Sequence, residues 1–163
     1  KRFQNGDWIK VENIVEGVVE KIGFRSTLIR RFDSSPVMVP NFNFAENAVT
    51  NFSNMKSRRI YWTIGLEYRT THDQLRIIRD QIEEYISSSG DFVKSSEQPL
   101  FVRLEKFSDS SIDILIYCFA TTTVWGEWLK IKEELALKIK SIVEENNAGF
   151  AFPSQSIYVE KNT

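Results

Sequence analysis

Cysteine and histidine are almost absent from this sequence of 163 residues. Cys118 is the only cysteine and His72 is the only histidine. A single cysteine excludes an internal disulfide and a metal site built from a cysteine cluster. A single histidine excludes a histidine-rich metal site within one chain. We therefore expect no metal and no cofactor.

An excess of charge of one sign is also missing. The sequence has 21 basic and 22 acidic residues, a net charge of −1, with 42% hydrophobic residues. This composition is typical of a globular protein and predicts no strong overall attraction to nucleic acid or anionic lipid. The Walker loop and the G-x-G-x-x-G, G-x-S-x-G and H-E-x-x-H motifs are absent too, so the sequence does not indicate an enzyme.

Long hydrophobic runs are the third absence. The longest nearly pure apolar run is Ile114–Ala120, whereas a membrane-spanning helix needs about 20 apolar residues. The sequence also begins with Lys1 rather than Met. We therefore expect a fragment of a longer protein, whose upstream part could contain membrane segments.

Residues 1–57 contain short β-rich runs separated by turn residues. The runs are Asp7–Val11, Gly17–Ile22, Phe24–Arg30 and Pro36–Val39. Short strands joined by tight turns predict a small, strongly bent β-barrel of the Sm-like type. Gly23 stands between two of the runs without other turn residues, so we interpret it as a bend or bulge in a strand.

Residues 58–152 predict a second domain of different character. A strand pattern in Arg58–Tyr68 precedes a helix that starts after Thr71 with a T-x-x-Q capping box. Leu100–Phe107 and Ile112–Phe119 then read as a hairpin, and apolar spacings of three and four predict a helix over Val124–Ile142. The order β-α-β-β-α predicts an α+β, ferredoxin-like sandwich.

Residues 153–163 form a short tail that begins at Pro153. Its segment Ser156–Glu160 alternates like a β-strand. A lone terminal strand is marginal by itself, so we expect it to pair with a sheet edge or with another chain.

Few side chains suggest chemistry. We expect His72 to be an exposed residue near a helix start and Cys118 to be buried among isoleucines. Two basic clusters leave alternatives open. The cluster of Lys56, Arg58 and Arg59 could bind an anion or be a polar linker. The cluster of Arg25, Arg30 and Arg31 could bind single-stranded nucleic acid or be an ordinary charged surface.

A set of segments in fixed order carries a resemblance to a known family. The segments are FQNGDWIKV, GVVEKIGFRSTLIR, VMVPN, NFS, RRIYWTIGLEY and AGFAFPS. The chain resembles the cytoplasmic part of the bacterial small-conductance mechanosensitive channel (MscS-like) family, and the resemblance covers nearly the whole chain.

The resemblance implies an architecture and a function. Transmembrane helices would precede this chain in a bacterial inner membrane protein, and this part would lie on the cytoplasmic side. The chains would form a homo-oligomer of seven copies. This heptamer would contain an Sm-like ring, a hollow cage with side openings and a terminal parallel barrel. The channel would open under membrane tension and release ions and small solutes. The alternatives are an Sm-like RNA-binding ring and a regulatory domain that senses a small molecule.

The resemblance also assigns residues to three parts of this architecture. The side openings would be lined by Ser53, Asn54, Met55, Lys56, Ser57, Arg58 and Arg59. The terminal barrel would be built from Ser156, Ile157, Tyr158, Val159 and Glu160. The β unit would be held by the motif residues Gly6, Asp7, Gly17, Gly23, Pro40, Asn41 and Asn51, together with Ser53.

Overall fold

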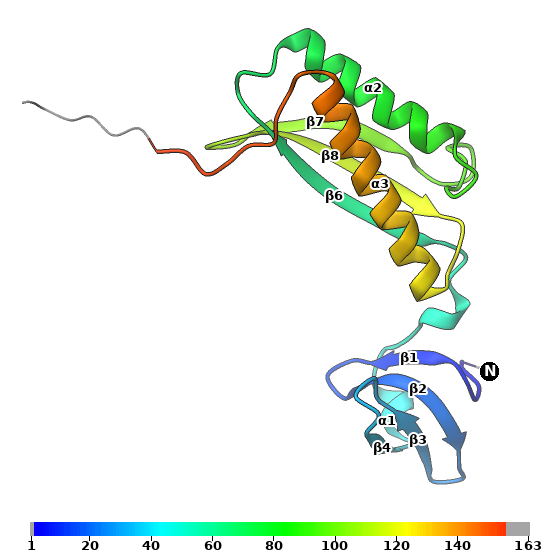
Figure 1. The fold of residues 1–163 in the computed structure, drawn as a ribbon. Helices are drawn as coiled ribbons and strands as arrows, with labels where there is room; N and C mark the ends of the chain where they lie inside the picture. Colours follow the sequence, from blue (N-terminus) through cyan, green and yellow to red (C-terminus); the bar gives the residue numbers. More distant parts are fainter. Residues whose placement is uncertain (1, 156–163) are drawn as a thin grey trace, which may run out of the picture. The chain divides into compact units, whose positions relative to one another are not determined.

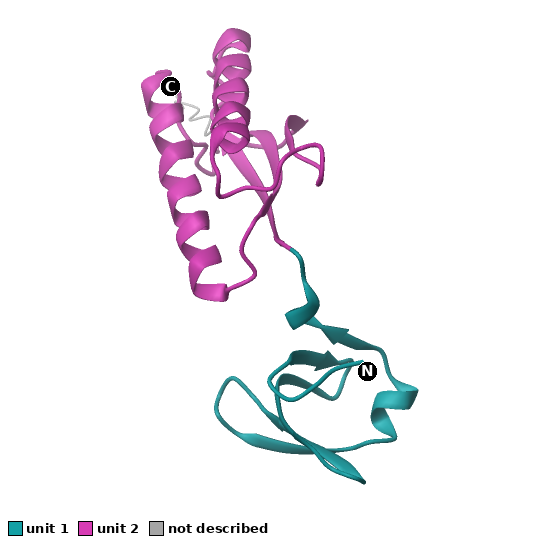
Figure 2. Ribbon diagram, turned by 90° about the vertical axis from the view of Figure 1, so that its right-hand side faces the viewer, with its two compact units in different colours: residues 1–56 teal, residues 57–163 magenta. Residues whose placement is uncertain are grey.

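The structure is a computed structural model that describes residues 2–155. The chain divides into two compact units, Lys1–Lys56 and Ser57–Thr163 (Figure 2). The sequence predicted its first domain boundary one residue later, after residue 57. The predicted terminal strand Ser156–Glu160 lies outside the described residues.

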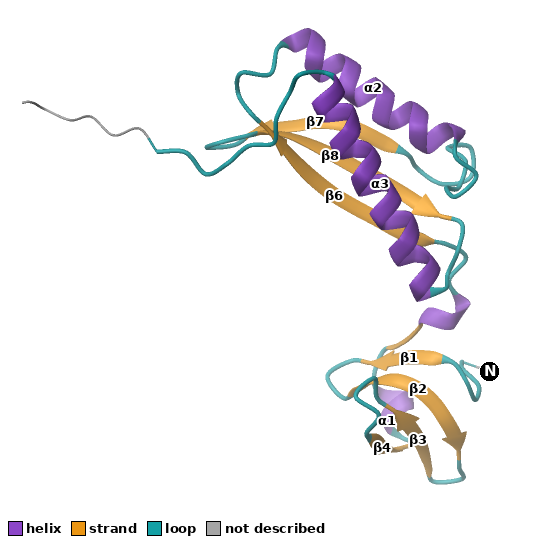
Figure 3. Ribbon diagram, viewed as in Figure 1, coloured by secondary structure: helices purple, strands orange, loops and turns teal. Residues whose placement is uncertain are grey.

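The first unit is a five-stranded antiparallel sheet with the order β4-β3-β2-β1-β5 (Figures 1 and 3). A short helix and one turn of 3-10 helix complete it. The elements are β1 (Trp8–Val11), β2 (Val15–Ile22), β3 (Ser26–Arg30), β4 (Pro36–Pro40), α1 (Asn43–Glu46), β5 (Val49–Asn51) and η1 (Phe52–Asn54).

The core of the first unit follows from the two-residue period of its strands. Alternate side chains point to one face of the sheet, so each strand contributes every second residue to the core. The buried apolar residues are Ile9, Val11, Val15, Val19, Ile29, Val39 and Phe44. A shift of one residue in register would turn these side chains toward solvent, which fixes the strand pairing.

The interpretation of Gly23 as a bend within a strand is wrong. β2 ends at Ile22 and β3 begins only at Ser26, so Gly23 lies in the hairpin loop between them. Its N–H donates to the carbonyl of Ser26 at 2.9 Å. The bulge in this strand pair lies between Val19 and Lys21 instead, where it adds local twist to the sheet.

Three elements of the first unit were not predicted, α1, β5 and η1. Each is only three or four residues long, which is too short for a hydrophobic period to show in the sequence. β5 exists because it pairs with β1, with Ile9 opposite Asn51 and Val11 opposite Val49. This contact is between residues far apart in the chain, so local sequence carries little trace of it.

The second unit has the predicted order β-α-β-β-α. Its elements are β6 (Arg58–Leu66), α2 (His72–Ser88), β7 (Phe101–Phe107), β8 (Ile112–Ala120) and α3 (Trp125–Glu145). The three strands form an antiparallel sheet in the order β6-β8-β7. Both helices lie on the same side of this sheet (Figures 1 and 2).

The local signals of the second unit are confirmed in detail. The capping box forms at the start of α2, where the Thr71 hydroxyl accepts from the Gln74 N–H and the Gln74 side chain accepts from the Thr71 N–H. Ile78, Ile82 and Ile86 are buried on one face of this helix. They pack in the same core as β8 and α3, so the helical period places the apolar stripe against the sheet.

After α3 the chain returns to the edge of β6. The Glu67 N–H donates to the carbonyl of Gly149 at 3.0 Å, and the Ala151 N–H donates to that of Gly65 at 2.9 Å. Leu66 and Phe150 form an antiparallel bridge between these segments. The segment 149–151 is therefore held against β6 by backbone hydrogen bonds.

Across residues 2–155, no helix is both long enough and apolar enough to cross a membrane.

Candidate functional site

Asp7 is the centre of a buried polar contact in the first unit. Its carboxylate accepts hydrogen bonds from the N–H of Gln4 at 2.9 Å and from the side-chain amide of Asn51 at 2.8 Å. The residue is buried, and a buried carboxylate requires hydrogen-bond partners because it has left water. The contact therefore holds the start of β1 against the end of β5.

Asn51 extends this contact toward Ser53. Its side-chain carbonyl accepts from the Ser53 N–H at 3.0 Å and caps the 3-10 helix η1. The Ser53 hydroxyl in turn accepts from the backbone N–H of Trp8 at 2.9 Å. Three of the motif residues that the resemblance indicated, Asp7, Asn51 and Ser53, thus belong to one network. We call these three residues with Trp8 the Asp7 network.

Asn41 forms a second clamp at the other end of the sheet. Its amide N–H groups donate to the carbonyls of Gly23 and Phe24 at 2.9 and 3.1 Å. Its amide oxygen accepts from the hydroxyl of Thr27 at 2.8 Å. This side chain fixes the β2–β3 hairpin loop to the end of β4, which closes with Pro40 opposite Ser26.

Gly17 is required by the close approach of two strands. A Cβ atom at this position would lie 2.3 Å from the carbonyl oxygen of Arg30 and 2.9 Å from a side-chain carbon of Ile29. No side chain fits there without moving backbone. Gly6 extends the β1–β2 pair just before β1 begins, since its N–H donates to the carbonyl of Val19 in β2 at 2.7 Å.

The seven residues predicted to line side openings differ in exposure. Ser53, Asn54, Lys56 and Arg59 are exposed, Met55 and Ser57 are half-buried, and Arg58 is buried. Arg58 has a different environment from the one expected for a lining residue.

Arg58 is enclosed by the start of α3. Its guanidinium carbon lies 5.2 Å from the ring centre of Trp125 and 5.6 Å from that of Trp128, and its Nε donates to the carbonyl of Thr123 at 2.8 Å. Burial lowers the pKa of this guanidinium from its ordinary value, yet arginine stays charged. Arg58 therefore anchors α3 to β6 through cation–π contacts.

Two features of this anchor were missed in the sequence. Thr123 and Trp125 were not singled out, and Trp128 was interpreted only as part of an apolar helix face. Two tryptophans three residues apart at the start of a helix lie on neighbouring positions of its surface. Together with an arginine pair in the facing strand, this spacing is a signal that could have identified the contact.

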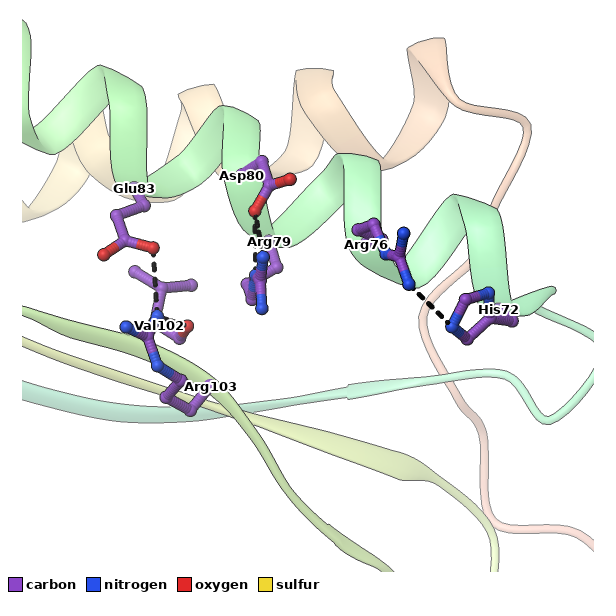
Figure 4. A network of polar contacts seen from close by, with 7 residues as sticks. All are labelled: His72, Arg76, Arg79, Asp80, Glu83, Val102 and Arg103. Atoms are coloured by element: carbon purple, nitrogen blue, oxygen red, sulfur yellow. Dashed lines mark hydrogen bonds and ion pairs between the residues drawn. The ribbon is translucent and has the colours of Figure 1, made fainter.

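A row of charged groups follows α2 beside β7 (Figure 4). The Arg76 guanidinium lies 3.2 Å from Nε2 of His72, Arg79 pairs with Asp80, and Arg103 pairs with Glu83 at 3.0 Å. His72, Leu75, Arg76, Arg79, Leu104 and Ile114 line a cavity of about 220 Å³. Two of the three arginines in this row, Arg79 and Arg103, thus form ion pairs with carboxylates.

The two rare residues have the environments expected for them. His72 is exposed, and its Nδ1 lies 3.2 Å from Oδ1 of Asp73. Cys118 is buried in the core of the second unit. Burial raises the pKa of its thiol to about 12, so it is not a reactive cysteine. Within residues 2–155, no cluster of three histidine, cysteine, aspartate or glutamate residues could hold a metal ion.

Comparison with known families accounts for both units. Residues 1–54 match the family model described as the mechanosensitive ion channel β-domain, and residues 60–150 match that of the mechanosensitive ion channel MscS C-terminal domain. Both models describe parts of mechanosensitive channels. The chain belongs to the MscS family, as the resemblance indicated, and this is a family of channels rather than enzymes.

Relatives in several bacteria match almost the whole chain. The low conductance mechanosensitive channel YnaI of Escherichia coli is 40% identical over 162 residues, which are 99% of this chain and 46% of YnaI. An uncharacterized MscS family protein of Helicobacter pylori is 41% identical over 97% of this chain and 30% of its own length. The chain thus spans less than half the length of these relatives.

Solved structures show the same fold. The crystal structure of Helicobacter pylori MscS in its closed state has a TM-score of 0.80 at 25% identity, covering 98% of this chain and 60% of that one. The structure of Arabidopsis thaliana MSL1 A320V has a TM-score of 0.84 at 24% identity, covering 93% and 56%.

Proposed function

We propose that this chain is the cytoplasmic region of a tension-gated channel that protects a bacterium from osmotic stress. The observation that carries the proposal is the match of both units to MscS-family domains, with 40% identity to the mechanosensitive channel YnaI over 99% of the chain. Transmembrane helices upstream would place the channel in the inner membrane. This membership favours a channel over the RNA-binding ring and the ligand-sensing domain.

No bond is made or broken in this function. Membrane tension would act on the transmembrane helices and shift the channel toward the state that occupies the larger membrane area. Tension can favour one state over another only when the two states differ in that area. The present chain would build the structure below the pore. The channel would pass ions and small solutes, and this chain would sieve them.

We propose that the assembly is a homo-oligomer of seven copies, a heptamer. The first unit would form an Sm-like ring in which the sheet of each copy closes into a small barrel. The second unit would build the cage. Its strand order β6-β8-β7, with both helices on one side, supports a ferredoxin-like arrangement. Residues 156–160 would form the terminal parallel barrel with the other copies.

We assign the side openings to the exposed residues of the joint. Ser53, Asn54 and Lys56 offer hydroxyl, amide and cationic groups to passing solutes. Met55 and Ser57 are half-buried. Arg58 would stabilise the opening indirectly, through its contacts with Trp125 and Trp128 of α3. The Asp7 network and the Asn41 clamp would hold the ring.

Patch-clamp recording of the full-length protein tests the proposal. Spheroplasts of a host that lacks its own mechanosensitive channels should show currents under suction when they express the protein. The same spheroplasts without it serve as the control. A well-expressed, membrane-inserted protein that gives no tension-evoked current would refute the channel function.

A further inference from the structure

One face of the sheet in the second unit has no covering layer among residues 57–155, the part of this unit that the structure describes. Side chains alternate along a strand, so Ile60 and Ile116 point toward the helices while Tyr61 and Tyr117 point away. Tyr61 and Tyr117 lie opposite each other in the β6–β8 register. The helices α2 and α3 both lie on the other side of the sheet (Figures 1 and 2).

This face carries a cluster of aromatic rings. The Tyr117 ring centre lies 5.9 Å from that of Tyr61, 6.1 Å from that of Phe101 and 5.5 Å from that of Phe119. Tyr61 is 57% exposed and Phe101 is 48% exposed. The Arg59 guanidinium lies over the rings of Tyr61 and Tyr117 at 5.7 and 5.8 Å. We call these five residues the aromatic sheet patch.

Aromatic and arginine side chains in this arrangement are typical of the centre of a protein interface. Tyrosine and arginine are enriched among the residues that carry binding energy. The rings already hold one another in place, so little conformational freedom is lost when a partner covers them. An exposed cluster of this kind indicates an interaction surface.

The second unit has another apolar surface on its helical side. Leu129, Glu133 and Leu137 follow one another at intervals of four along α3, and such residues lie on the same face of a helix. Leu129 is 43% exposed and Leu137 is 57% exposed. We call these three residues the outer stripe of α3.

The two surfaces complement each other in charge. The aromatic sheet patch has Arg59 among its rings, and the outer stripe has Glu133 between its leucines. Within residues 2–155, neither Arg59 nor Glu133 makes an ion pair. One surface thus offers a cation amid apolar groups and the other an anion amid apolar groups.

We propose that the aromatic sheet patch of one copy of this chain binds the outer stripe of α3 of the next copy. The surfaces are different and lie on opposite sides of the same unit. Such a contact is head-to-tail, and repetition by rotation closes a ring. The proposal rests on the proposed function in one respect, that the copies assemble; it adds the surfaces through which the second units meet.

Photocrosslinking in the full-length protein tests this contact. Benzoylphenylalanine replaces Phe101, and illuminated membranes are analysed by gel and by mass spectrometry. We expect crosslinked dimers and larger species whose peptides map to residues 125–145 of another copy. The matched control places the same residue at Ile77 of α2, which is 44% exposed, and should give no crosslink to α3 of another copy.

Charge exchange tests the pairing of Arg59 with Glu133. R59E and E133R should each lower the crosslink yield from position 101 by about tenfold, in line with the coupling of close interfacial charges. The double variant should restore most of the yield, because the charges are then exchanged rather than removed. Circular dichroism shows whether each variant is folded.

Two results would overturn the proposal. One is an assembled protein in which position 101 gives no crosslink, or crosslinks only outside α3, as it would if RNA or another protein covered the patch. The other is a monomeric mass for the full-length protein. Tension-evoked currents without the crosslink would leave the channel function standing, whereas the crosslink without currents would leave only the contact.

Discussion

The carboxylate of Asp7 accepts a hydrogen bond of 2.8 Å from the side-chain amide of Asn51, a residue 44 positions later. The contact joins the first strand of the sheet to its last, since β1 and β5 are neighbours. Asp7 is buried and Asn51 is half-buried, so removing one partner leaves a polar group of the other with reduced access to water and no hydrogen bond. The pair therefore fixes the position of Asn51, whose side chain caps η1 near the end of the first unit.

Removing either partner should destabilise the first unit. We expect D7A and N51A to lower the free energy of unfolding by about 1–3 kcal/mol each, the penalty for leaving a buried polar group without a partner. The double variant should cost less than the sum, because the interaction is lost only once. Urea unfolding monitored by circular dichroism measures these values.

Asn54 provides the matched control for this cycle. It is an exposed asparagine in the same 3-10 helix, and N54A should change the free energy of unfolding by less than about 0.5 kcal/mol. Strict additivity of D7A and N51A would show that the contact contributes nothing to folding.

Replacing Gly17 by alanine should distort the β2–β3 strand pair. The added Cβ would meet the Arg30 carbonyl oxygen at 2.3 Å, and overpacking of this kind costs about 1–3 kcal/mol of stability. Gly126 in the first turn of α3 is the control, because a Cβ there meets nothing within 4 Å. G126A should be neutral or stabilising, and thermal unfolding distinguishes the two variants.

Arg58 should not tolerate replacement by lysine. Its planar guanidinium lies near two indole rings and donates from Nε to Thr123, a combination that an ammonium group cannot reproduce. We expect R58A to cost about 2–4 kcal/mol from the lost cation–π and hydrogen-bond contacts. R58K should recover less than half of this.

Tryptophan fluorescence and urea unfolding measure the effect of Arg58. The emission of the half-buried Trp128 should shift to longer wavelength in R58A, because water then reaches its ring. R25A changes an exposed arginine of the first unit and should leave both signals unchanged. A stable R58A with an unaltered spectrum would contradict the anchoring role.

The second unit was predictable from sequence because its elements are long and strongly periodic. Four strand residues at Ile112, Ile114, Ile116 and Cys118 alternate, and α3 repeats its apolar positions over five turns. Such patterns state which face is buried without reference to the rest of the chain. The capping box of α2 likewise depends only on residues three apart.

The first unit shows where this reasoning ends. β5 is three residues long and is defined by its partner β1, and the hairpin loop at Gly23 is held by the distant side chain of Asn41. Contacts between residues far apart leave no local period. The family resemblance pointed to Asp7, Asn41 and Asn51, but the hydrogen bonds that these residues make are seen only in the structure.

Cys118 should be unreactive in the folded protein. Its thiol is buried and its pKa is raised to about 12, so at pH 8 almost none of it is the nucleophilic thiolate. We expect no reaction with a thiol reagent in native buffer and one equivalent in denaturant. The variant F24C adds a thiol at an exposed hairpin position and should react at once; rapid native labelling of the unmodified chain would contradict the buried placement.

Asp113 should make the stability of the second unit depend on acid pH. The hydroxyls of Ser108 and Ser111 donate to its carboxylate at 2.6 Å each, and these bonds, the one from Ser108 first, lower the pKa of Asp113 below its ordinary value. The unfolded chain then binds a proton more readily than the folded one. The stabilisation is present above the unfolded pKa and is lost as pH falls through the folded pKa.

Unfolding measured between about pH 6 and about pH 2 tests this linkage. The double variant S108A/S111A should be less stable at neutral pH and should lose less stability on acidification, because the pKa of Asp113 returns toward its ordinary value. D109N changes an exposed neighbouring carboxylate and should keep the slope of the parent chain. Equal slopes for the parent and the double serine variant would mean that the two hydroxyls do not stabilise the charged form of Asp113.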